Sequence, residues 1–291
     1  MKLKHITISF FLLLIVIVFS SSCQSEQTSG AKEPVIKKWT EIDENGKKIE
    51  FMMIDGIMVH EEDPVKQPQP IVVTPGTVSC GEKVGSAPSD AIVLFDGTAE
   101  SLKNWTDTKG DPTKWKLVDG ALESVKNAGI IQSTGNFGSC QLHVEWASPS
   151  TIKGSGQGRG NSGVFLMGYE VQVLDSFDNI TYPDGQAGAL YGQKKPLVNA
   201  SRGPGQWQSY NIIFHRPIFD DKGGVVKKAT FTVIHNGVLI QDHVMLSGGT
   251  GWRGSHSISE YAAHPDALPI QLQDHGNPVR FRNIWIRPLE D

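Results

Sequence analysis

From Ala91 to the C-terminus, short apolar runs alternate with turn residues, and this alternation constrains the fold more than any other feature of the sequence. Runs such as AIVLF, QLHVEW and ATFTVIH are rich in the β-branched and aromatic residues that strands favour. Asn236-Gly237, between ATFTVIH and VLIQDHV, is the clearest hairpin signal. No segment has helical periodicity over three turns, and residues 255–263 would form one turn at most. About ten or more short strands with no helix to cover them predict an all-β jelly-roll β-sandwich, in which two sheets cover each other.

Three of the predicted strands separate an apolar face from a face of Glu, Gln and His, because side chains alternate across a strand. The polar positions are Gln141, His143 and Glu145 in the first, Glu170 and Gln172 in the second, and Gln271, Gln273 and His275 in the third. Lys is absent from these faces. Amide, imidazole and carboxylate groups offer directional donors and acceptors to sugar hydroxyls, so the pattern favours a saccharide-binding surface. A plain solvated face is the alternative.

The segment GNSGVFLMGYEVQVLD, residues 160–175, carries the most specific local pattern. Its spacing places Glu170 and Gln172 on one face of a strand, whereas Asp175 lies opposite unless a bulge near Leu174 returns it to the same side. Two carboxylates beside a polar residue predict an acid together with a base or nucleophile for glycoside cleavage. The alternative is a polar outer face on which Asp175 caps a turn.

A second pattern, QLQDHGNPVRFRNIWIRP, brings an acid, an imidazole and an amide into one turn at residues 274–278. His275 is the candidate general base, since the pKa of an imidazole lies near working pH. A turn histidine that only fixes the loop is the equal alternative. Arg280 and Arg282 share a face and would anchor hydroxyls or a carboxylate, or else form surface ion pairs.

The candidate catalytic residues are therefore Glu170, Asp175 and His275. Polar groups on the predicted faces and on the glycine-rich loop 154–163 form the candidate substrate-binding set: Glu145, Arg159, Asn161, Gln172, Gln271, Gln273 and Arg280. That loop lacks the Lys-Ser/Thr of a phosphate-binding loop. The histidines show no metal-ligand spacing, so we predict no metal site and no cofactor, while a structural cation such as calcium stays open.

The N-terminus has the order of a secretory signal peptide. Lys2 and Lys4 precede an almost unbroken apolar run, and three serines then lead to Cys23. We expect cleavage after residue 22 and a lipid on Cys23, which would anchor the protein in a bacterial cell envelope, facing the periplasm or the cell surface. An ordinary signal peptide that releases a soluble protein is the alternative.

Residues 23–34 read as a polar tether, and residues 35–90 as a small extension ahead of the main domain at 91–291. Asn45-Gly46 predicts a two-residue hairpin in the extension. The five prolines that follow, between residues 61 and 90, predict either an irregular linker or an extended strap on the main domain. Cys80 and Cys140 could pair in an oxidising compartment or remain free thiols.

The composition of the chain argues against nucleic acid as a partner. The formal net charge is −4 and charged residues are 20% of the chain, with no basic run interleaved with aromatic residues. Nucleic acid is therefore not an expected partner.

Several blocks occur in a fixed order: LFDGTAESLKNW, NSGVFL with YEVQVLD, GQWQSYNIIF, FTVIHNGVLIQD and PIQLQDHGNPVRFRNIWIRPL. In this order they resemble the 3-keto-disaccharide hydrolase family over residues 91–289. The resemblance implies a concanavalin A-like lectin/glucanase jelly roll. Family members often carry Arg after the NSGVFL run, where this chain has Met167.

The resemblance also implies an activity, the cleavage of glycosides already oxidised to a ketone at C3, by hydrolysis or by elimination followed by hydration. A base such as His275 or Glu170 would take the C2 proton, and an acid such as Asp175 would assist the leaving group. The substrate would be a keto-glycoside or oligosaccharide, and the N-terminal lipid would contact the membrane. The alternatives are a non-catalytic carbohydrate-binding module and an ordinary glycoside hydrolase on unoxidised glycans.

Overall fold

The computed structural model describes residues 33–61, 63, 67–252 and 256–291. The predicted signal peptide and Cys23 lie outside these residues. In the described part of the chain, no helix has the length and hydropathy needed to cross a membrane.

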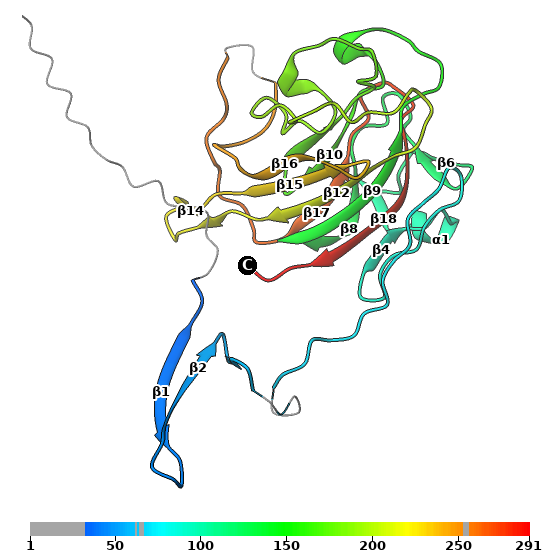
Figure 1. Ribbon diagram of the computed structural model, residues 1–291. Coiled ribbons are helices and arrows are strands. Elements are labelled where there is room, and N and C mark those ends of the chain that lie inside the picture. Colours follow the sequence, from blue (N-terminus) through cyan, green and yellow to red (C-terminus); the bar gives the residue numbers. More distant parts are fainter. Residues whose placement is uncertain (1–32, 62, 64–66, 253–255) are drawn as a thin grey trace, which may run out of the picture. The chain divides into compact units, whose positions relative to one another are not determined.

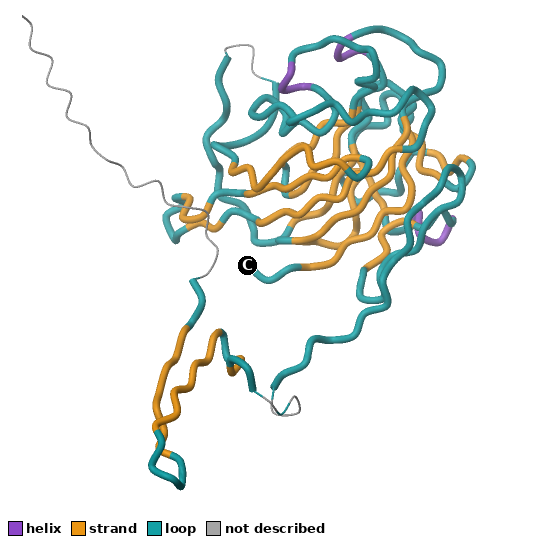
Figure 2. Tube along the Cα trace, in the orientation of Figure 1, coloured by secondary structure: helices purple, strands orange, loops and turns teal. Residues whose placement is uncertain are grey.

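Antiparallel strands joined by long loops build the main domain, and the described helices are short turns (Figure 2). The longest helix is α1, Ala99–Leu102. The predicted all-β jelly-roll sandwich is confirmed.

The larger of the two main sheets has seven strands in a continuous order, and an eighth, β4 (Ile92–Phe95), pairs with β18. Figure 1 shows β16, β15, β12, β9 and β18 side by side. In spatial order the strands are β16 (Val238–Met245), β15 (Thr230–His235), β12 (Gln208–His215), β9 (Cys140–Ala147), β18 (Arg280–Pro288), β7 (Ala121–Glu123) and β6 (Lys116–Val118).

The smaller sheet has five strands. In spatial order they are β11 (Tyr169–Val173), β10 (Ser162–Leu166), β17 (Leu268–Leu272), β8 (Ile131–Phe137) and β5 (Trp105–Asp107). A two-stranded ribbon, β13 (Ile218–Phe219) with β14 (Val225–Lys227), completes the domain.

The core lies between the two main sheets. On β9, Leu142, Val144 and Trp146 are fully buried, while His143 and Gln141 on the other face are half-buried. On β17, Ile270 and Leu272 are buried opposite Gln271. The predicted apolar and polar faces are confirmed for β9 and for β17 as far as Leu272, because each strand buries the set of alternating side chains that faces the second sheet. The prediction that this face continues to His275 is wrong, because β17 ends at Leu272 and His275 lies in the turn that follows. Burying each large apolar side chain contributes about 1.5–3 kcal/mol.

Both predicted Asn-Gly hairpins form, with different turns. Between β15 and β16, Asn236 and Gly237 both have positive φ, 53° and 82°, as a two-residue type I′ turn requires. The N-terminal hairpin has a longer loop than predicted, since β1 (Ile36–Ile42) pairs with β2 (Lys48–Ile54) and leaves residues 43–47 outside the strands. Asp43 Oδ1 closes that loop by accepting from the backbone N–H of Asn45 at 2.9 Å and of Lys47 at 2.8 Å. β3 (Ile57–Met58) is the third strand of this small sheet.

Residues 74–89 form a narrow, mostly extended loop that we call the strap. Its two arms are hydrogen-bonded at Thr74 with Ser89 and at Thr77 with Ser86, and its tip is the turn from Cys80 to Lys83. Cys80 is exposed and Cys140 is buried, and both thiols are free.

Candidate functional site

The smaller sheet carries a polar face centred on Glu170. The register of β11 with β10 sets Glu170 opposite Phe165 and Gln172 opposite Gly163. Gln271 of β17 lies opposite Phe165 on its other side. Because directly opposed residues of antiparallel strands share a face, the predicted residues Glu170, Gln172 and Gln271 lie on one surface.

Gly163 makes room for the carboxyl group of Glu170. A Cβ atom at residue 163 would lie 2.5 Å from Glu170 Oε1, which is too close for any side chain. The side-chain amide of Gln172 lies 2.9 Å from Glu170 Oε1 and 3.0 Å from Gln157 Oε1. Glu170 is therefore held between a bare stretch of backbone and an amide pair.

Burial changes the chemistry of Glu170. Its side chain is nearly inaccessible, with 5% relative exposure, and this burial raises the pKa of its carboxyl group to about 8. A carboxyl group is favoured in its neutral form when desolvation is not offset by cations or donors. Glu170 therefore keeps its proton at neutral pH and is able to act as a general acid.

Aromatic side chains surround this acid. The hydroxyls of Tyr182 and Tyr191 are 2.6 Å apart, and burial is the main cause that raises the pKa of both. The ring of Trp252 packs 5.4 Å from that of Tyr182 and remains 68% exposed. An exposed indole beside a protonated acid is suited to stacking on a sugar ring.

Two other predicted residues, Asn161 and Gln273, form hydrogen bonds to backbone carbonyl groups beside this polar face. Asn161 donates to the carbonyl oxygen of Gln157 at 2.8 Å, which fixes the loop that carries Gln157. The backbone N–H of Gln273 donates to the carbonyl of Gly163 at 3.1 Å. Both residues border the Glu170 site.

Asp175 and Arg159 lie elsewhere. Arg159 Nε donates to Asp175 Oδ2 at 2.8 Å, and both side chains are buried. They line a cavity of about 690 Å³ that also includes Arg280 and Asn277, whereas Glu170 is not among its lining residues. Asp175 comes after the end of β11, so the strand alternation that aligns Glu170 with Gln172 does not extend to it.

His275 is exposed in the turn after β17. In that turn Asp274 Oδ1 accepts from the backbone N–H of Gly276 at 2.7 Å, and the backbone carbonyl of His275 accepts from Asn277 Nδ2 at 3.3 Å. Within the described ranges, no three His, Cys, Asp or Glu side chains gather as a metal site would require.

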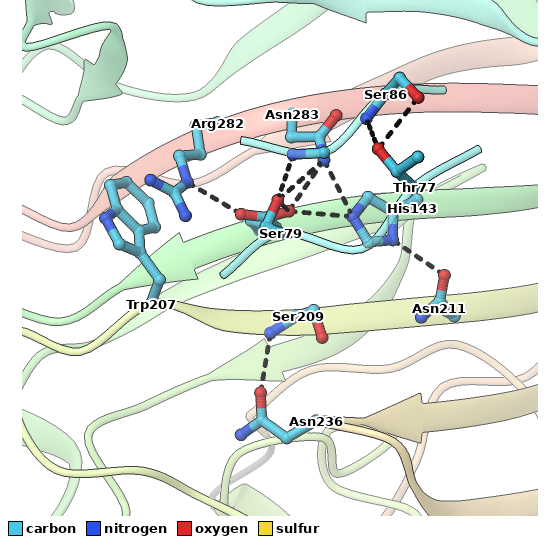
Figure 3. Close-up of polar contacts among 12 residues, drawn as sticks. Thr77, Ser79, Ser86, His143, Trp207, Ser209, Asn211, Asn236, Arg282 and Asn283 are labelled. Atoms are coloured by element: carbon cyan, nitrogen blue, oxygen red, sulfur yellow. Dashed lines mark hydrogen bonds and ion pairs between the residues drawn. The ribbon is translucent and has the colours of Figure 1, made fainter. Parts of the chain in front are cut away.

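Glu145, the last of the predicted residues, belongs to the outer face of the larger sheet. Figure 3 shows its surroundings, where His143, Arg282, Asn283 and Ser79 converge. Arg282 Nε donates to Glu145 Oε2 and Asn283 Nδ2 donates to Oε1, each at 2.8 Å, and the Ser79 hydroxyl of the strap also donates to Oε1. Burial alone would raise the pKa of Glu145, but the hydrogen bonds from His143, Ser79, Asn283 and Arg282 outweigh it and lower the pKa to about 2.

Comparison with known proteins places this chain in a family. The profile of the 3-keto-alpha-glucoside-1,2-lyase-like domain matches residues 90–287, which is more than half of the chain. The chain belongs to this family. The resemblance inferred from the ordered sequence blocks is thereby confirmed.

Two proteins that are similar to this chain show what kinds of protein its relatives are. A solved structure of a candidate glycosyl hydrolase from Parabacteroides distasonis is 46% identical, covers 79% of this chain and 97% of its own, and superimposes with a TM-score of 0.73. The 3-keto-disaccharide hydrolase of Bacteroides thetaiotaomicron is 22% identical over 68% of this chain and 78% of its own. The names of these relatives are those of glycoside-cleaving enzymes, which is the activity of the family at its coarsest level.

Sequence reasoning missed several groups that this 3-keto-alpha-glucoside-1,2-lyase-like domain brings to Glu170. Tyr182, Tyr191 and Thr250 come from irregular loops and Gln157 from a single 3-10 turn, where no periodicity marks which side chains point inward. A glycine inside a strand pattern often marks a close approach, and Gly163 was such a signal.

Proposed function

We propose that this protein cleaves glycosides whose sugar carries a ketone at C3, with Glu170 as the general acid. The observation that carries the proposal is a buried carboxyl group beside Gln172, in a member of this family, whose burial raises its pKa to about 8. The 3-keto substrate itself is suggested by the name of the Bacteroides thetaiotaomicron relative.

The proposed chemistry needs only modest help from the protein. A ketone at C3 acidifies the C2–H bond, so a base removes that proton and the electron pair forms a C1=C2 double bond. The C1–O bond breaks, and the leaving oxygen takes the proton of Glu170. Water then adds across the double bond, so that the overall reaction is a hydrolysis. General acid assistance of this kind is typically worth about 10²- to 10⁴-fold in rate.

The base remains a separate proposal. His275 is our candidate, because it follows Gln273 by two residues and the backbone N–H of Gln273 contacts Gly163, the residue beneath Glu170. Asp175, paired with Arg159, would contribute to binding further along the polar surface.

The test is the release of aglycone from a 3-keto-glucoside and from its unoxidised parent. We expect release from the ketone alone, with a kcat about 10²- to 10⁴-fold lower for Glu170→Gln. Because the acid must be protonated, kcat should fall as pH rises through about 8. Release from the parent would indicate an ordinary glycosidase, and binding without release from either would indicate a carbohydrate-binding module.

The order of charge, apolar run, serines and cysteine at residues 1–23 supports a further part of the proposal, a lipid anchor on Cys23 in the cell envelope. Incorporation of labelled fatty acid into the protein, and its loss in Cys23→Ala, would test the anchor. An unlabelled protein would indicate cleavage by an ordinary signal peptidase.

A further inference from the structure

The outer face of the larger sheet holds a groove that has no part in the chemistry proposed for Glu170. Its volume is about 800 Å³, within the range of sites that hold small molecules. The sheet forms the floor and the strap forms one wall (Figure 3). Because the family profile begins at residue 90, this wall lies outside the matched domain.

The floor consists of two cross-strand rows. Register across β18, β9 and β12 aligns Arg282 with Glu145 and Glu145 with Ser209. The next row aligns Trp285, His143 and Asn211. Side chains in such rows lie close enough to contact a single ligand together.

The charged groups of the first row are already neutralised. Glu145 and Arg282 form a buried ion pair at 2.8 Å, and the guanidinium of Arg282 also packs 4.0 Å above the ring of Trp207. The strap completes this pair, since its Gly81 carbonyl accepts from Arg282 Nη2 at 2.7 Å and its Ser79 hydroxyl donates to Glu145. This pair therefore offers no free charge to a ligand, and its carboxylate already accepts a hydroxyl.

The second row and the far wall keep hydrogen-bonding capacity. His143 Nδ1 and Asn211 Oδ1 lie 2.8 Å apart, a hydrogen-bonding distance that orients the Asn211 amide. Among the described residues, none accepts from Asn211 Nδ2 or bonds to the side chain of Ser209. Asn236 fixes the neighbouring wall, because its Oδ1 accepts from the Ser209 N–H at 2.9 Å. Beside these groups the rings of His143 and Trp285 are stacked with centroids 5.0 Å apart, which provides an apolar surface.

We propose that this groove is a second saccharide site, which binds a neutral mono- or disaccharide unit independently of Glu170. An oriented amide and a hydroxyl next to stacked rings suit a ligand that has hydroxyls on its edges and C–H groups on its faces. The compensated ion pair disfavours an anionic ligand, which would have to approach the Glu145 carboxylate.

The test uses the full-length protein with Glu170→Gln, so that a substrate would persist during the measurement. The probes are cellobiose, trehalose and lactose at millimolar concentrations. The readout is the indole N–H resonances of Trp207, Trp285 and Trp252, each assigned through its Trp→Phe variant. Trp207 reports on the strap because its Nε1–H donates to Glu82 Oε2 at 3.1 Å.

We expect at least one disaccharide to shift the Trp207 and Trp285 resonances in a saturable manner. Asn211→Ala should weaken the affinity for the disaccharide about tenfold, which corresponds to about 1.4 kcal/mol of binding free energy. Asn136→Ala is the matched control, because Asn136 is an exposed asparagine in β8 of the other sheet. This variant should leave the affinity for the disaccharide unchanged. If Asn211→Ala disturbs folding, Ser209→Val offers a second variant that fills the groove at a strand position where valine is favoured.

Shifts confined to Trp252, or no shift with any of the probes, would overturn the second site. The second site is also overturned if the Asn211→Ala and Ser209→Val proteins both bind the disaccharide with the affinity of the parent. These outcomes are separate from failure of the proposed function, which would be seen as undiminished turnover of the 3-keto-glucoside by Glu170→Gln.

Discussion

At the scale of single residues, two buried glutamates show how partners decide protonation. Glu145 and Glu170 are nearly equally inaccessible, with 3% and 5% relative exposure. The pKa of Glu145 is about 2 and that of Glu170 about 8. Both groups are desolvated, but only Glu145 is paired with a guanidinium, together with further donors that stabilise its charge. Glu145 is therefore ionised and paired with a cation, whereas Glu170 retains its proton at neutral pH.

The raised pKa of Glu170 predicts a dependence of stability on pH. Between its ordinary value of 4.5 and about 8, the folded protein holds a proton that the unfolded chain has released. The free energy of unfolding should therefore fall as pH rises through this window, by about 1.4 kcal/mol per pH unit from this group. Urea unfolding of the parent and of Glu170→Gln at several pH values measures the difference, in which all other titrating groups cancel. A pH-independent difference would contradict the assignment.

A second residue-scale prediction concerns Gly163. Its Cβ in Gly163→Ala would lie 2.5 Å from Glu170 Oε1, so the carboxyl group must move away from the position in which we propose that it protonates the leaving group. We expect kcat to fall at least about tenfold, because displacing an acid by a fraction of an ångström weakens proton transfer. Gly203→Ala is the control, since its Cβ would meet only the flexible Gln206 side chain at 3.9 Å. Equal rates for the two variants in the 3-keto-glucoside assay would argue against this position of Glu170.

At the scale of elements, β18 contains an irregularity that builds the Glu145 cluster. Its register with β9 shifts between Arg282 and Trp285, so that one extra residue is accommodated there. Asn283 within this shift has a positive φ of 47°. Adjacent residues of a regular strand point to opposite faces, but the bulge lets both Arg282 and Asn283 reach Glu145.

The bulge makes a prediction about substitutions at Asn283. Asn283→Gly removes the amide but accepts the left-handed backbone, whereas Asn283→Val loses the amide and must also adopt a conformation that β-branched residues avoid. We expect the valine variant to be less stable than the glycine variant by about 1–3 kcal/mol. Denaturant unfolding of both proteins measures this difference. Equal stabilities would show that the backbone at residue 283 is not strained by a side chain.

At the scale of the whole molecule, the two outer faces of one sandwich carry different polar chemistry. The smaller sheet presents a protonated acid with amides and aromatic rings, and the larger sheet presents a compensated ion pair beneath the strap. A shared core separates them, so each face can be altered without the other. Of the ten catalytic and binding residues predicted from sequence, Glu170, Gln172 and Gln271 share one face, which Asn161 and Gln273 border. Arg159, Asp175 and Arg280 line a second cavity, Glu145 lies on the other sheet, and His275 lies in an exposed turn.

The strap leads to a prediction at this scale. Proteins that begin at Gln67 and at Asp90 differ in whether the strap is present, while both keep the ion pair of Asp90 with Arg287. Without it, Arg282 loses the carbonyl of Gly81 and Glu145 loses the hydroxyl of Ser79, which leaves buried charged groups short of partners. Each such loss costs about 1–3 kcal/mol, so the shorter protein should have a Tm lower by several degrees. Calorimetry of the two truncated proteins would decide this, and identical Tm values would show that the strap does not stabilise the sheet.

Sequence alone determined the fold class, the strand faces and the family. Strand alternation is a local property, so Leu142, Val144 and Trp146 could be assigned to the core from their spacing. The Asn236-Gly237 turn was predictable for the same reason, since its two positive φ angles are a property of those residue types.

Only the tertiary structure decided which polar groups meet. Glu170 and Asp175 are five residues apart in the sequence, yet Asp175 pairs with Arg159 while Glu170 faces Gln172 and lies over Gly163. Ser79 and Glu145 are 66 residues apart and share a hydrogen bond. The protonation state of each buried carboxyl group depends on such distant partners, and for that reason the sequence could nominate Glu170 and Glu145 as functional residues but could not assign a proton to one and a charge to the other.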